Sequence, residues 1–483
     1  MKLAVSFWMC ALALTGAGGI ESHATEVVRG PYLQSATPNG VTIRWRTDVP
    51  VESVIHYGLQ TNDLSFSASQ QTPTNEHILS LSGLTPATTY YYAIGSATQA
   101  LAVGLDYKFV TPPPSGDGGS TRVWVIGDSG GFLYADGNGR PAEVRDAYYQ
   151  HAGARTTDVW LLLGDNAYDN GSDAEYQTNF FNVYPSLLRQ TAPWPTIGNH
   201  DTYSILPNQS FPYLNLFSLP TNGEAGGAAS ANPRYYSFDH GNIHFICLDS
   251  TTQSRATNGA MANWLRADLA VTTNQWIIAF WHHAPYSKGT HNSDFSSEIE
   301  MIEMRENFLP ILEAGKVDLV LGGHSHNYER SYLLHGHYGY STELKPEMIL
   351  DQGSGRENDT GAYIKATSGP FANRGTVYLV AGNASHIEPG YGRHPAMFTN
   401  ELQIGSVVLE INSNRLDAMF LRETGAIDDH FTIMKRIRSH YTSVPSSFKT
   451  ARPLFAGNPS AERATKYNAQ QTGYTQTGSP PAK

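Results

Sequence analysis

VWLLLGDNAY, residues 159–168, is a run of apolar, strand-forming residues that ends in Gly-Asp. Polar residues also stand at the ends of apolar runs in GDSG (127–130), GNHD (198–201), HAP (283–285) and GHSH (323–326). A short apolar run bounded by a turn signal is typical of a buried strand in an α/β sheet. Because ligands at the ends of such strands meet in one crevice, we expect the five segments to converge.

The polar residues of these segments are all ligands of first-row metals. A carboxylate with a phenolate suits a trivalent ion such as Fe(III), whereas an amide oxygen with two imidazoles suits a divalent ion. Asp165 has two oxygens that can bridge two ions, while Tyr168, three residues later, folds back onto one of them. The sequence therefore predicts a site for two metal ions. For Asn199 taken alone, a cap on the following helix is the alternative.

Composition excludes some classes of function. The 483 residues carry a formal net charge of -11 and no run of Lys or Arg, which argues against nucleic-acid binding through a basic face. With 40% apolar residues the chain can bury a large core and form two or three domains. Of the two cysteines, Cys10 lies in the N-terminal leader, and Cys247 lies in an apolar run and is expected in the core.

The two ends of the chain differ from the rest in composition. Residues 1–24 begin Met-Lys, continue with an apolar run and end Ser-His-Ala, which predicts a cleaved secretory signal. No other apolar stretch approaches the roughly 20 residues that span a bilayer, so we expect a secreted or periplasmic protein without a membrane span. A single signal anchor is the alternative. Residues 441–483 are rich in Ser, Thr, Pro, Gly and Gln and predict a disordered tail.

Between these ends the pattern predicts two folded domains. Residues 26–110 alternate in short strands without a helical period, which predicts an all-β sandwich, and the Pro/Gly-rich residues 111–120 predict a linker. Residues 121–425 alternate strands with helices, as in an α/β domain with two mixed sheets flanked by helices. Expected within it are helices at 141–152, 260–269 and 297–314, a hairpin at 235–245, and a strand pair at 406–411 and 416–421.

The ordered set GDSG, GDNAY, GNHD, HAP and GHSHNYER resembles that of the purple acid phosphatases, which are calcineurin-like metallophosphoesterases. The N-terminal sandwich and the segment RYYSFDHGNIHF are similar to the larger, plant-type members, which carry a fibronectin type III-like domain ahead of the catalytic one. The resemblance covers roughly residues 27–425. It implies a catalytic domain in which two mixed β-sheets are flanked by helices, an αββα sandwich.

The resemblance also implies roles for individual residues. Fe(III) would be bound by Asp128, Tyr168 and His326, Asp165 would bridge, and a divalent Zn, Fe or Mn would be bound by Asn199, His283 and His324. His200 matches a histidine beside the substrate phosphate, and His291 lies near the position of another. Gly130 stands where most calcineurin-like enzymes have a metal-binding histidine, and Tyr168 would supply the missing ligand.

The roles of two further pairs of histidines are left open by the motifs. His282 and His283 would face opposite ways on a strand; His-x-Pro matches the family at His283, so His282 is expected to pack in the core. His335-Gly336-His337 imitates the fifth motif but lacks a strand of its own, so we expect it in a surface loop.

The expected function is that of a secreted acid phosphatase acting on small phosphate monoesters. A metal-bound hydroxide would attack phosphorus, and His200 and His291 would bind the phosphate and protonate the leaving group. A phosphodiesterase or nucleotidase on the same metal core is one alternative. A non-catalytic binding scaffold is another, which the presence of all seven ligands disfavours.

Overall fold

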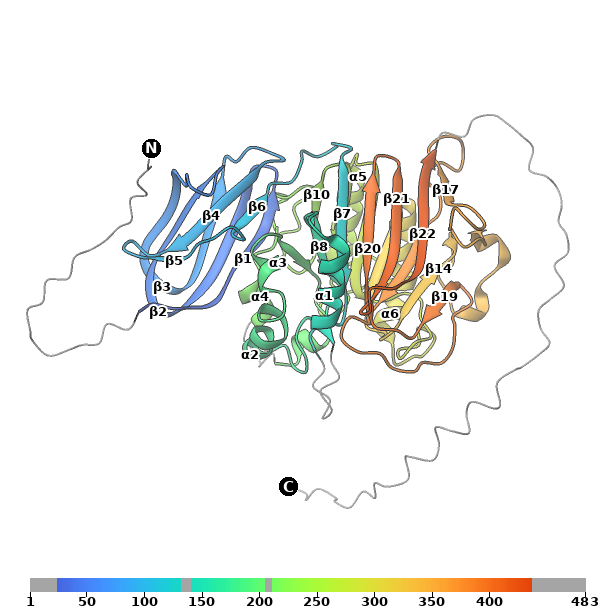
Figure 1. The fold of residues 1–483 in the computed structure, drawn as a ribbon. Coiled ribbons are helices and arrows are strands. Elements are labelled where there is room, and N and C mark those ends of the chain that lie inside the picture. The colour runs from blue at the N-terminus through green and yellow to red at the C-terminus, as the bar shows by residue number, and fades with distance from the viewer. Residues whose placement is uncertain (1–23, 132–139, 205–210, 437–483) are drawn as a thin grey trace, which may run out of the picture. The chain divides into compact units, whose positions relative to one another are not determined.

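The computed structural model describes residues 24–131, 140–204 and 211–436 (Figure 1). The expected secretory signal, apart from Ala24, and the expected disordered tail at 441–483 lie outside the described residues. Among the helices of the described ranges, none has both the length and the apolar character needed to cross a membrane.

The N-terminal domain is built of antiparallel strands, as expected. They are β1 (Val27–Thr37), β2 (Gly40–Gly58), β3 (Phe66–Ser82), β4 (Thr89–Gly95), β5 (Ala100–Ala102) and β6 (Lys108–Val110). The long β2 pairs with β1 through its first half and with β4 through its second half, so one bent strand serves both halves of the domain. Trp45 of β2 is buried in the core of this domain and stacks on His77, with ring centroids 4.6 Å apart.

The first sheet of the catalytic domain has seven strands in the order β17-β22-β21-β20-β7-β8-β9. Their bounds are β7 (Ser120–Ile126), β8 (Val159–Leu162), β9 (Pro193–Pro195), β17 (Tyr363–Ala366), β20 (Gly405–Asn412), β21 (Arg415–Arg422) and β22 (Ile427–Arg436). β7, β8 and β9 are parallel, and the predicted strand pair β20–β21 is antiparallel and is confirmed. β22 carries this sheet beyond residue 425, where the sequence placed the end of the domain.

The second sheet also has seven strands, in the order β10-β11-β12-β13-β18-β14-β19. Their bounds are β10 (Tyr236–His240), β11 (Ile243–Cys247), β12 (Trp276–His283), β13 (Leu319–Gly323), β14 (Tyr328–Ser331), β18 (Val377–Ala381) and β19 (Met397–Glu401). β10 and β11 form the predicted hairpin, and β11, β12, β13 and β18 are parallel. β15 (Leu333–Leu334) and β16 (Ile349–Asp351) form a separate small ribbon.

Helices occur at the three predicted places, and the short α2, α3 and α4 are additional to the prediction. The helices are α1 (Pro141–Ala152), α2 (Asp173–Glu175), α3 (Pro185–Leu188), α4 (Pro212–Leu216), α5 (Ala260–Val271), α6 (Ile299–Glu303) and α7 (Leu309–Ala314). A π-helical turn at Met304–Phe308 joins α6 to α7, so the helix expected at 297–314 is continuous but not uniform. A second π-helical segment (Tyr176–Phe181) and three short 3₁₀ turns (His200–Thr202, Ser341–Glu343, Pro346–Met348) complete the set.

Alternation of buried side chains along β12 shows how the layers stack. Ile278 and Phe280 join the core that the two sheets share, whereas Ala279 and Trp281 join a second core with α5, α6 and α7. On the first sheet, Trp124 stacks on Tyr148 of α1 with ring centroids 4.2 Å apart, and Figure 1 shows α1 in front of that sheet. The predicted αββα sandwich is therefore confirmed, and Cys247 lies in its core.

Candidate metal centre

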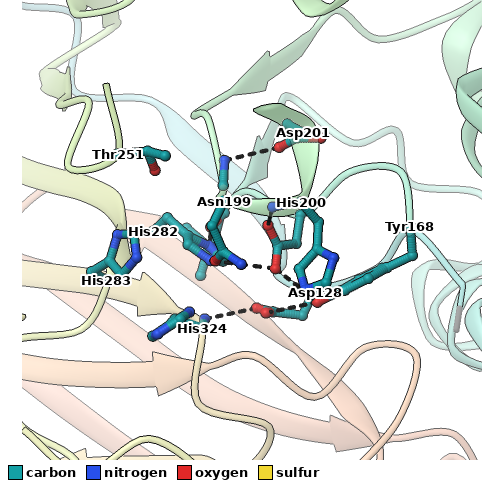
Figure 2. A network of polar contacts seen from close by, with 12 residues as sticks. Asp128, Tyr168, Asn199, His200, Asp201, Thr251, His282, His283 and His324 are labelled. Atoms are coloured by element: carbon teal, nitrogen blue, oxygen red, sulfur yellow. Dashed lines mark hydrogen bonds and ion pairs between the residues drawn. The ribbon is translucent and has the colours of Figure 1, made fainter. Parts of the chain in front are cut away.

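The five motif segments follow the ends of β7, β8, β9, β12 and β13, which run parallel within each sheet. Three of the predicted ligands adopt left-handed backbone conformations: φ is 53° at Asp128, 51° at Asp165 and 69° at His324. This region is unfavourable for residues with a Cβ, and such residues are found often at active sites. The turns after β7 and β13 meet, since the backbone nitrogen of His324 donates to Asp128 Oδ2 at 2.9 Å (Figure 2).

Asp128, Asp165 and Tyr168 form the first half of the site. The Tyr168 hydroxyl lies 3.2 Å from Asp128 Oδ1 and 2.9 Å from Asp165 Oδ2. His326 Nε2 approaches Asp128 Oδ1 at 3.5 Å from the GHSH segment. The two carboxylates, the phenol and one imidazole thus converge, and all four side chains are buried.

Gly130 explains why a tyrosine completes this half. A Cβ at residue 130 would lie 2.6 Å from the backbone nitrogen of Ala167, so a side chain there would collide with the loop that follows β8. The close approach of these two loops brings Tyr168 over Asp128 instead. A similar constraint holds at Gly198, where a Cβ would lie 2.1 Å from Asp165 Oδ1.

The charges of this half fit a cation. Within residues 24–131, 140–204 and 211–436 neither Asp128 nor Asp165 has a Lys or Arg partner, although both are at most 1% exposed. Burial together with the neighbouring Asp128 and Asp165 raises the pKa of Tyr168 well above its usual value. Buried carboxylates need a compensating positive charge, and hard oxygen ligands of this kind suit a highly charged metal ion.

Asn199, His282 and His324 form the second half, on the other side of Asp165. His282 Nε2 lies 3.0 Å from Asn199 Oδ1 and 3.4 Å from Asp165 Oδ2, while its Nδ1 lies 2.8 Å from the carbonyl of Leu163. Ligand atoms of His282, His283 and His324 all lie within 4.8 Å of one another. Asn199 begins the 3₁₀ turn without a side-chain cap, so the capping alternative is not what the structure shows.

His282 is fully buried, as expected, but its Nε2 faces Asn199 and Asp165 rather than apolar side chains. Strand alternation fails here because β12 has an irregularity against β13: Phe280 pairs with Leu321, but His283 pairs with Gly323. The extra residue of β12 is a bulge, which re-aims side chains and is common beside active sites. Both neighbouring imidazoles consequently lie in the cluster of potential metal ligands that the two halves of the site form. His283 Nδ1 lies 2.9 Å from Ser250 Oγ.

His200 lies at the rim of the site, and Figure 2 shows its ring between Tyr168 and Asn199. Its backbone nitrogen donates to Asp165 Oδ1 at 2.8 Å, and its Nδ1 lies 2.8 Å from the carbonyl of Asp169. Asp201 does not orient the ring, since its carboxylate accepts instead from Asn166 and from the backbone of Gly198. The last residue of GNHD thus braces the loop that carries Asn199.

His291 also lies in the cluster, and it has a partner that the sequence did not reveal. Its ring stacks on His324 with centroids 3.7 Å apart, and its Nδ1 lies 2.8 Å from Glu298 Oε1. Glu298 Oε2 lies 3.3 Å from His324 Nε2, so one carboxylate links both imidazoles. A lone Glu in a loop after His291 carries no motif by which it could have been found.

The second ambiguous pair lies away from the cluster. His337 is 1% exposed and stacks on Tyr286 with ring centroids 5.3 Å apart, so the surface-loop expectation is wrong for this residue. His335 Nδ1 lies 3.0 Å from Glu313. Neither belongs to a group of potential metal ligands in the part of the chain that the structure describes.

Two family descriptions match the chain: "Calcineurin-like phosphoesterase" over residues 121–328 and "Purple acid Phosphatase, N-terminal domain" over residues 29–111. Purple acid phosphatase 22 of Arabidopsis thaliana is 29% identical over 298 residues, which cover 59% of this chain and 62% of that protein. Purple acid phosphatase 15 of the same plant is 28% identical over 311 residues, which cover 58% of this chain and 54% of that protein. The match thus spans less than two thirds of either relative.

A solved structure, that of purple acid phosphatase PPD1 from yellow lupin (Lupinus luteus) seeds, has the same fold. The TM-score is 0.66 at 18% identity, and the match covers 87% of this chain and 78% of that one. The fold and the site define a calcineurin-like phosphoesterase. More narrowly, the chain belongs to the purple acid phosphatase family within that class.

Proposed function

We propose that this protein is a metal-dependent phosphatase that hydrolyses small phosphate monoesters. The observation that carries the proposal is the Tyr168 hydroxyl within hydrogen-bond distance of both Asp128 and Asp165, two buried carboxylates without a cationic side-chain partner among the described residues. The family membership supports the same class of reaction. The apolar leader supports secretion or a periplasmic location.

Two groups of side chains would hold two metal ions. Fe(III) would take Asp128, Tyr168 and His326, a divalent Zn, Fe or Mn would take Asn199, His283 and His324 with His282 beside them, and Asp165 would be shared. When bound, two such metal ions neutralise phosphate charge and make a water molecule acidic enough to supply hydroxide near neutral pH.

The remaining residues act on the phosphate ester itself. His200 is partly exposed. Its backbone nitrogen donates to Asp165, and its Nδ1 contacts the Asp169 carbonyl, so Nε2 is directed away from that carbonyl. His291 is held by Glu298 and by its stack on His324. Imidazoles fixed in this way can hydrogen-bond the phosphate oxygens and give a proton to the leaving alkoxide.

Replacing Tyr168 by Phe tests the metal assignment. We expect the purified wild type to contain about two metal ions per chain and to show a broad visible absorption band, because a phenolate bound to Fe(III) absorbs by charge transfer. Tyr168→Phe should lose that band. The measurement is a visible spectrum combined with metal analysis.

The control is Tyr91→Phe, which changes a tyrosine of β4 in the N-terminal domain and should keep both the band and the metals. A colourless wild type with two divalent ions would refute the Fe(III)–Tyr168 assignment but leave metal-dependent hydrolysis standing. A wild type without bound metal would refute the proposed function.

A further inference from the structure

A second buried histidine contacts His326 on the side away from Asp128. His386 comes from the loop after β18, and its Nε2 lies 2.8 Å from His326 Nδ1, with ring centroids 3.9 Å apart. Its ring also meets the Tyr168 ring edge-on at 5.7 Å. His386 is 4% exposed and therefore part of the interior behind the proposed iron side of the site.

Ser385 links His386 to the backbone of another proposed ligand. The Ser385 hydroxyl contacts the carbonyl oxygen of Asp128, and its Oγ lies 2.9 Å from His386 Nδ1. A carbonyl can only accept, and a hydroxyl has one proton. Ser385 must therefore donate to Asp128, and it accepts from the Nδ1–H of His386.

The direction of each remaining hydrogen bond follows. A neutral imidazole carries one N–H, so His386 with a proton on Nδ1 has a lone pair on Nε2. That lone pair accepts the Nδ1–H of His326, and the lone pair of His326 is then on Nε2. This is the nitrogen that faces Asp128 Oδ1 at 3.5 Å, where a metal ion shared with Asp128 and Tyr168 would lie.

We infer that Ser385 and His386 are positioning residues that hold His326 in the tautomer with Nε2 free for the metal. Metal-binding histidines usually donate their other N–H to a carboxylate, a carbonyl or water. Here the acceptor is a second imidazole, and the relay Asp128–Ser385–His386–His326 fixes two proposed ligands relative to each other. Glu388 Oε1, 3.9 Å from His326 Nδ1, is beyond hydrogen-bond distance. The inference rests on the proposed function.

Substitution of His386 tests the relay without relying on activity. His386→Leu removes the acceptor, and we expect it to weaken metal binding about 10- to 100-fold in competition with a chelator. His386→Gln can accept through its side-chain oxygen and should retain most of the affinity. His430→Leu changes an exposed histidine of β22 and should bind metal as the wild type does.

A second readout uses the metal-free protein with ¹⁵N-labelled histidine. At a pH high enough for His326 to be neutral, its ring, assigned by its loss in His326→Gln, should show a protonated Nδ1 in the wild type and a mixture of tautomers in His386→Leu. If His386→Leu does not fold, Ser385→Ala is expected to produce the same mixture.

The two readouts separate the inference from the function on which it rests. Unchanged metal affinity in His386→Leu, or a neutral wild-type His326 with its proton on Nε2 instead of Nδ1, would overturn the relay. A wild type that binds no metal would overturn the proposed function, whatever tautomer His326 adopts.

Discussion

Replacing Asp165 by Asn is expected to lower kcat/KM for a phosphate monoester by at least about 10³-fold, which corresponds to several kcal/mol of transition-state stabilisation. Asp165 lies between the two halves of the site, with Oδ2 2.9 Å from the Tyr168 hydroxyl and 3.4 Å from His282 Nε2. Asn has the same shape but lacks the negative charge that both ions would share. The variant should also contain less metal than the wild type.

Asp158→Asn is the matched control, because Asp158 directly precedes β8 and Asp165 follows the opposite end of the strand. Asp158 accepts from the backbone of Arg122 and has no contact with the cluster, so its variant should keep wild-type kcat/KM. Wild-type activity and metal content in Asp165→Asn would contradict the bridging role.

The largest effect on stability is expected from Asp429→Asn. Asp429 is fully buried and accepts from Arg330 Nε at 2.6 Å and Nη2 at 2.9 Å, and also from the Tyr328 hydroxyl at 2.8 Å. These bonds connect β14 of the second sheet to β22 of the first. Removing the charge leaves the Arg330 guanidinium buried without its partner, which costs about 3–5 kcal/mol in the free energy of unfolding. Urea unfolding of the wild type and the variant measures this difference in the free energy of unfolding.

The neighbouring Asp428 provides the control, since it is exposed and lies 3.5 Å from Arg422, so Asp428→Asn should change stability by less than about 1 kcal/mol. Burial opposes ionisation of Asp429, but Arg330 outweighs it and lowers the pKa of this carboxyl. The stabilisation is therefore present above the unfolded pKa of about 4 and is lost at lower pH. A difference between wild type and Asp429→Asn that stays constant down to acid pH would contradict this assignment.

The fold and most of the site could be predicted from the sequence because the signals are local. VWLLLGD and VDLVLGG are apolar runs with abrupt polar ends, and parallel strands carry such ends to one edge. This rule alone predicts that Asp128, Asp165 and His324 lie close together. Tyr168 also drew on the family resemblance, which implies that Gly130 replaces a metal-binding histidine; the structure explains the glycine by the contact between the two loops.

The errors have physical causes that a linear pattern does not record. His282 was expected to face away from the site because strand residues alternate, but the irregularity between β12 and β13 brings both neighbouring imidazoles into the cluster. His386 follows VYLVAGN, an apolar run with the same kind of ending, and β18 pairs in parallel with β13. The signal was present, yet only the sheet order places that loop beside His326.

The most direct test of the central claim is hydrolysis of p-nitrophenyl phosphate by the purified protein before metal removal, after chelation, and after Fe and Zn are restored. The account predicts turnover that falls with the metal content and returns with it, and faster hydrolysis of this monoester than of bis-p-nitrophenyl phosphate. Turnover that persists in the metal-free protein, or none in the fully loaded protein, would contradict a metal-dependent phosphatase.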